Sequence, residues 1–78
     1  MNLYTYYNEG EKQVFATHNN GELYFFYKGF ASKEEAYNTT LNAHIVAYKE
    51  EKGDTNLSNS FVREWVETSL QGTWKEIK

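Results

Sequence analysis

The chain has 78 residues, with 8 basic and 11 acidic side chains and a formal net charge of −3. It contains no cysteine, which excludes disulfide frameworks, cysteine-based zinc sites and thiol catalysis. The mild negative charge does not attract nucleic acid over long range. The longest uninterrupted apolar run, residues 23–27, is too short to span a membrane, and the N-terminus lacks the features of a secretory signal. We therefore expect a single domain over residues 1–78 in the cytoplasm.

The first third of the chain predicts three β-strands joined by turns. Residues 2–7, 12–18 and 22–28 are rich in strand-forming residues. Gly10 supplies turn chemistry between the first two strands. Asn20-Gly21 is typical of a two-residue hairpin turn and predicts that Asn19 opposes Glu22. The result is a three-stranded antiparallel meander.

The middle of the chain predicts a long helix. Ser32 followed by Glu35 matches a capping box, in which the serine caps the helix and the glutamate reaches back. Gly53 is well placed to end the helix after about Lys52. Helical spacing places one set of residues on the inner face, Tyr37, Leu41, His44, Ile45 and Tyr48, flanked by small residues, Ala36, Thr40, Ala43 and Ala47.

A second, shorter helix is expected from Ser58 or Ser60 to about Gln71, with Gly72 as its C-terminal cap. On this helix, Phe61, Val62, Trp65 and Ser69 share a face. Residues 73–77 could form a short closing strand. The fold class is thus α+β in the order β-β-β-α-α-β, a three-stranded meander, with a possible fourth strand, packed on one long and one shorter helix.

The predicted register divides the second and third strands between two faces. One face carries Val14, Ala16, Leu23, Phe25 and Tyr27, and we expect it to be the core under the long helix. The other carries Phe15, Thr17, Tyr24 and Phe26, with Glu22 and Lys28 at its ends. A face without covering helices should be polar. Either the second helix or the closing strand with Trp74 covers these aromatics, or they form an interaction patch.

No constellation of residues points to catalysis or to a metal. The two histidines, His18 and His44, have no spacing that suggests a ligand set, and we expect them to be solvated and packed, respectively. Asp54 is the only aspartate, so no Ser-His-Asp arrangement can be singled out. We expect no enzymatic activity, no metal site and no cofactor.

The remaining functional hypothesis is a small protein-binding module. Lys outnumbers Arg by seven to one, and the composition favours an AT-rich genome such as that of a low-GC bacterium, its phages or plasmids. We therefore expect a phage- or mobile-element-encoded inhibitor of a host protein or nucleoprotein complex, of the anti-CRISPR or anti-restriction type, acting by steric occlusion in the host cytoplasm. The expected anchors are Phe15, Tyr24 and Phe26, and the expected rim residues are Glu22, Tyr6 and Tyr7.

Two alternatives stay open at this point. A sheet with surface aromatics can stack the bases of single-stranded nucleic acid, although the negative charge makes direct nucleic-acid binding less favourable. The chain could also be a homo-oligomeric accessory or structural phage protein that dimerises through the second aromatic face.

Overall fold

The structure, a computed structural model, describes residues 3–54 and 56–77. Its elements follow one another as β1 (Leu3–Asn8), β2 (Gln13–His18), β3 (Leu23–Lys28), α1 (Lys33–Lys52), α2 (Asn59–Thr73) and β4 (Trp74–Ile77). The predicted α+β class and the element order β-β-β-α-α-β are confirmed, and the closing strand is present.

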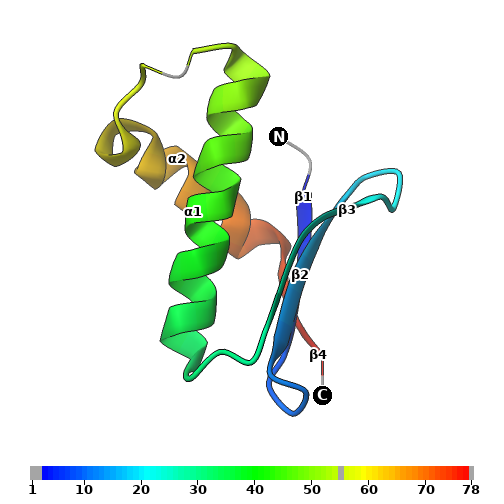
Figure 1. The fold of residues 1–78 in the computed structure, drawn as a ribbon. Helices are drawn as coiled ribbons and strands as arrows, with labels where there is room; N and C mark the ends of the chain where they lie inside the picture. Colours follow the sequence, from blue (N-terminus) through cyan, green and yellow to red (C-terminus); the bar gives the residue numbers. More distant parts are fainter. Residues whose placement is uncertain (1–2, 55, 78) are drawn as a thin grey trace.

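The four strands form one sheet in the order β3-β2-β1-β4. The β1–β2 and β2–β3 pairs are antiparallel, whereas β4 runs parallel to β1. Figure 1 shows that α1 and α2 lie on the same side of this sheet. The second helix therefore does not cover the opposite side of the sheet, which carries Phe15 and Phe26.

Local capping interactions fix both ends of α1. The Ser32 hydroxyl accepts a hydrogen bond from the backbone N–H of Glu35 at 3.2 Å. The Glu35 carboxylate reaches back to the N–H of Ala31, one residue before the cap, and also accepts the hydroxyl of Tyr27. At the other end, Gly53 has φ of 70°, and its N–H donates to the Glu50 carbonyl. The predicted boundaries of this helix are confirmed.

The helix α2 begins as predicted but ends later. Ser58 caps it by accepting the N–H of Phe61 at 3.1 Å. The helix then continues through Gly72 to Thr73, so the prediction that Gly72 ends it is wrong. The glycine does not adopt positive φ, and the N–H of Trp74 still donates to the Leu70 carbonyl. The chain thus passes directly from helix into β4 without a left-handed cap.

The core consists of two clusters that one tryptophan joins. The first lies between the helices and comprises Leu41, Ile45, Val62, Val66 and Leu70. The second lies between the sheet and the start of α1 and comprises Tyr7, Val14, Phe30 and Ala36. The half-buried side chain of Trp74 packs against both clusters. Its ring stacks on Tyr7, with a centroid distance of 5.3 Å.

Within residues 3–54 and 56–77, neither helix combines the length and the hydrophobicity that a membrane-spanning segment requires.

Candidate functional site

The side of the sheet away from the helices, called the outer face below, is the main candidate surface. Side chains alternate along each strand, and the inward-facing residues of β1 and β2 are buried, as Leu3, Thr5, Val14 and Ala16 show. The strand pairings then place the intervening residues on the outer face: Tyr4, Tyr6, Asn8, Gln13, Phe15, Thr17, Leu23, Phe26, Lys28, Lys75 and Ile77.

An aromatic row crosses the outer face from β3 to β1. Tyr6 pairs with Phe15 across β1 and β2, and Phe15 pairs with Phe26 across β2 and β3. The rings of Tyr6 and Phe15 stack on each other, with centroids 5.1 Å apart and an interplanar angle of 25°. Phe26, at the β3 end of the row, is 51% exposed. At the other end, Lys75 on β4 lies beside Tyr6. The row is therefore a rigid, largely apolar strip with a cation at one end.

The turn between β2 and β3 differs from the predicted one. His18 rather than Asn19 bonds with Glu22, so the loop contains three residues, and only Gly21 among them has positive φ, of 86°. This geometry is typical of three-residue hairpins with glycine in the left-handed position. The β2–β3 pairing also shifts by one residue at Ala16/Thr17, and this shift restores the predicted pairing of Phe15 with Phe26.

These two irregularities exchange the faces of Leu23 and Tyr24. Leu23 pairs with Thr17 on the outer face and is 57% exposed, whereas the sequence placed it in the core. Tyr24 was expected beside Phe15, but its hydroxyl donates to the carbonyl of Ala43 in α1, at 3.2 Å. The prediction that Tyr24 shares a surface with Phe15 is therefore wrong, because one extra residue in β3 turns the side chain towards the helix.

The predicted rim residues divide in a similar way. Tyr7 is only 2% exposed and belongs to the core, so it cannot serve as a surface rim residue in this structure. Tyr6 lies on the outer face within the aromatic row. Glu22 is exposed in the turn at one end of the face. The structure thus brings Tyr6, Phe15 and Phe26 together on one surface, and their contact with a partner stays a prediction.

His44 is buried as predicted and is 1% exposed. Its Nε2 lies 3.2 Å from the hydroxyl oxygen of Thr5 on β1, and its Nδ1 has no hydrogen-bond partner. Burial lowers the pKa of His44 from 6.5 to about 4, so the ring is neutral at physiological pH. His18 is exposed, and its ring contacts Tyr24 edge-on at 5.4 Å. The two imidazoles therefore occupy different surroundings and share no site.

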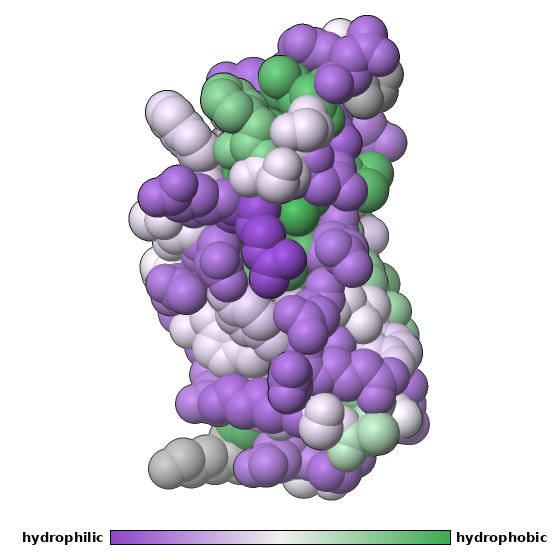
Figure 2. Space-filling view, turned by 90° about the vertical axis from the view of Figure 1, so that its left-hand side faces the viewer, coloured by the Kyte–Doolittle hydropathy of each residue, from purple (hydrophilic) through white to green (hydrophobic). Residues whose placement is uncertain are grey.

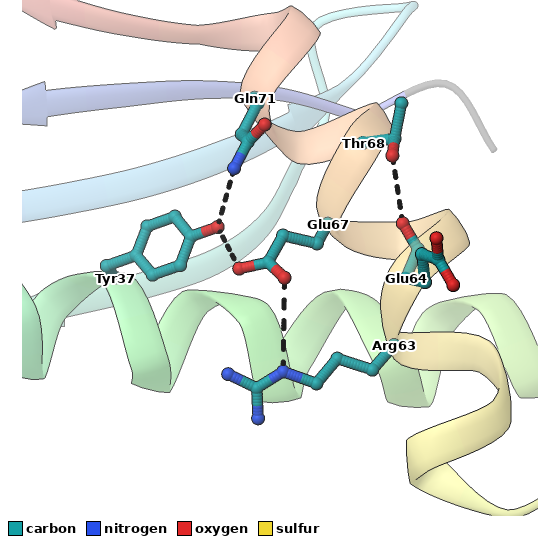
Figure 3. Close-up of polar contacts among 6 residues, drawn as sticks. All are labelled: Tyr37, Arg63, Glu64, Glu67, Thr68 and Gln71. Carbon is teal, nitrogen blue, oxygen red and sulfur yellow. Dashed lines mark hydrogen bonds and ion pairs between the residues drawn. The ribbon is translucent and has the colours of Figure 1, made fainter.

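A polar network that was not predicted from the sequence links the two helices (Figure 3). The hydroxyl of Tyr37 on α1 donates to the Glu67 carboxylate on α2 at 2.6 Å and accepts from Gln71 at 3.5 Å. Arg63 pairs with the same carboxylate at 4.0 Å. Burial, followed by the hydrogen bond to Glu67, raises the pKa of the Tyr37 hydroxyl. The network orients α2 against α1 and needs no ligand to be complete.

A second group of exposed aromatics lies on α2. Val62 is buried, but Phe61 and Trp65 are 65% and 67% exposed, so the face that these residues were expected to share is divided between core and surface. Figure 2 views the helical side and shows hydrophobic surface gathered towards the end where α1 finishes and α2 begins. The buried set of α2 recurs every four residues, Val62, Val66 and Leu70, and this spacing could have indicated that Phe61 and Trp65 point elsewhere.

In the part of the chain that the structure describes, no group of three or more His, Asp or Glu side chains is arranged to hold a metal ion. No protein-family model, curated protein or solved structure matches the chain.

Proposed function

We propose that this protein is a non-enzymatic binding module whose outer face docks on another protein. The observation that supports the proposal is that both helices lie on one side of the sheet, which leaves Phe26, Leu23 and Tyr4 exposed on the other side. Tyr6 and Phe15 lie half-buried between them. Exposed apolar surface of this kind usually marks an interaction site. Aromatic side chains on strands are good anchors, because they bury a large area at low entropic cost.

The proposed mode of action is steric occlusion. The outer face is formed by four paired strands, so we expect it to dock without a large rearrangement. By covering a groove on the partner, it would prevent the partner's normal ligand from binding there. In the setting that the composition favours, a phage or mobile element of an AT-rich host, the partner would be a host protein or nucleoprotein complex and the module its inhibitor.

The ring geometry favours a protein over single-stranded nucleic acid as the partner. Base recognition on a sheet requires ring faces that are free to stack. Tyr6 and Phe15 each cover one face of the other. The formal charge of −3 also opposes the approach of a polyanion.

The proposal is tested with substitutions that introduce charge on the outer face without disturbing the core. Phe26→Glu and Leu23→Glu change half-exposed side chains, and Phe61→Glu is the matched control on the helical side. The tagged variants are used for affinity capture from a low-GC bacterial lysate, with mass spectrometry as the readout. We expect one or more proteins that the wild type and the Phe61→Glu control retain and that both outer-face variants lose.

Capture that survives both outer-face substitutions and disappears with Phe61→Glu would contradict the proposal and move the site to α2. Circular dichroism of each variant establishes that the fold is retained, because replacing these half-exposed side chains by glutamate should cost about 1 kcal/mol of stability.

A further inference from the structure

The lysines divide according to whether they have a partner within the molecule. Six lie in the described part of the chain, and four of them are engaged: Lys33 with the Glu76 carboxylate, Lys49 with the Asn59 amide oxygen, Lys12 with the Phe30 ring and Lys52 with the Tyr48 ring. Among the described residues, the side chains of Lys28 and Lys75 make no hydrogen bond, ion pair or ring contact. Both of these unengaged lysines lie on the outer face.

Their positions bracket the aromatic row. Lys75 pairs with Tyr6 and continues the row onto β4. Lys28 lies on β3 two residues beyond Phe26, beside the other end of the row, and pairs with Gln13. The described strand positions on this face include no carboxylate. Glu76 follows Lys75 on β4 but faces the helical side, where it pairs with Lys33. The other nearby acidic residues, Glu9, Glu11 and Glu22, lie in the turns. An acidic protein thus presents a locally basic and aromatic surface.

This arrangement restricts what can cover the face. A partner that packs on the aromatic row also removes water from the neighbouring ammonium groups. Desolvation of an unpaired charge is costly, so a well-matched partner supplies a carboxylate to each lysine. A second copy of this chain is poorly matched, because it would oppose its own two outer-face lysines and offer no strand carboxylate in return.

We propose that the outer face recognises a protein segment in which acidic residues flank a short apolar or aromatic stretch. Neighbouring strands are about 4.8 Å apart, so β3 and β4 are separated by about 14 Å across the row. An extended segment advances about 3.3 Å per residue. Carboxylates about four or five positions apart would therefore meet Lys28 and Lys75 while the residues between them pack on the row. This inference rests on the proposed function and names the chemistry of its partner.

The test uses selection from a displayed library of short random peptides. The library is panned on wild-type protein, and the enriched peptides are synthesised and measured by fluorescence anisotropy. We expect an acidic–apolar–acidic consensus and chemical-shift changes at outer-face residues in the ¹⁵N-labelled protein. Lys28→Glu with Lys75→Glu should weaken binding about tenfold or more, equivalent to two partly desolvated ion pairs. Lys49→Glu with Lys52→Glu, the same charge change on α1, should leave it unchanged.

The outcomes separate this inference from the proposed function. Peptides without acidic residues that bind the outer face and are lost on Phe26→Glu overturn the inference while leaving the proposed function intact. Peptides that map to α2, or a library that yields no binder, count against both. Binding of a single-stranded thymidine oligonucleotide is measured in parallel. Binding that depends on Lys28 and Lys75 and falls steeply with salt would overturn the proposal and indicate that the partner is a nucleic acid.

Discussion

At the scale of single residues, the pair formed by Thr5 and His44 is the most unusual feature of the interior. Both side chains are buried, and they join β1 to the middle of α1. Helical spacing was sufficient to predict that His44 faces inward. The partner could not be predicted, because Thr5 lies 39 residues away in the sequence and only the tertiary fold brings the two together.

This pair predicts a specific loss of stability in mild acid. The pKa of His44 is about 4 in the folded protein and about 6.5 when unfolded, so the unfolded state binds the proton more readily. The contribution of His44 to the free energy of unfolding is therefore complete above pH 6.5 and falls as the pH decreases towards 4. The loss should approach about 3 kcal/mol. Urea denaturation across this range measures it.

The matched variant for this prediction is Thr5→Val combined with His44→Leu. Replacing both partners removes the titrating group without leaving one polar atom unpaired. The slope of stability against pH between 4 and 6.5 should decrease markedly in the double variant. An unchanged slope would show that other groups cause the acid sensitivity.

At the scale of elements, the predictions from the sequence were accurate where local chemistry decides the structure. The Ser32 cap of α1 and the left-handed Gly53 are set by neighbouring residues and are as predicted. The helix α2 begins after Ser58, the first of its two candidate starting serines. The hairpin between β2 and β3 was less predictable, because Asn20-Gly21 is compatible with more than one turn. That difference of one loop residue is what moved Tyr24 away from the predicted surface.

The two helix-end glycines should respond to alanine in opposite directions. Gly53 has φ of 70°, so Gly53→Ala forces a side chain into the left-handed region and should cost about 1 kcal/mol. Gly72 lies within α2, and an added Cβ would meet nothing within 4 Å. Gly72→Ala should therefore stabilise the protein by about 0.5–1 kcal/mol. Thermal unfolding of the two variants compares them directly, and the same sign for both would contradict the observed conformations.

At the scale of the whole molecule, Trp74 connects the sheet to the helices by packing against both core clusters. It begins β4, stacks on Tyr7 of β1 and contacts Tyr37 of α1, with centroids 5.8 Å apart. The sequence suggested a closing strand here but could not indicate that it runs parallel to β1. Nor could it show that the same tryptophan belongs to both core clusters, since this depends on how the two layers pack.

We therefore expect Trp74→Ala to destabilise the entire domain by about 3 kcal/mol, because it removes a large aromatic contact from both clusters at once. Trp65→Ala is the matched control, since this side chain is 67% exposed, and its effect should remain within about 0.5 kcal/mol. Chemical denaturation followed by far-UV circular dichroism measures both without relying on tryptophan fluorescence. A loss confined to one part of the molecule, seen as a non-cooperative transition, would contradict the bridging role.

The pairing of β4 with β1 also has a kinetic consequence. Thr5 is in register with Trp74, so one neighbour of the first strand comes from the far end of the described chain. Closing so long a loop is entropically costly and is expected to occur late. On the ribosome, the three-stranded meander emerges before the helices that cover it and before the strand that completes it. Until then its aromatic residues are exposed on both faces, and the period before α2 and β4 dock is when the nascent chain is most prone to aggregate.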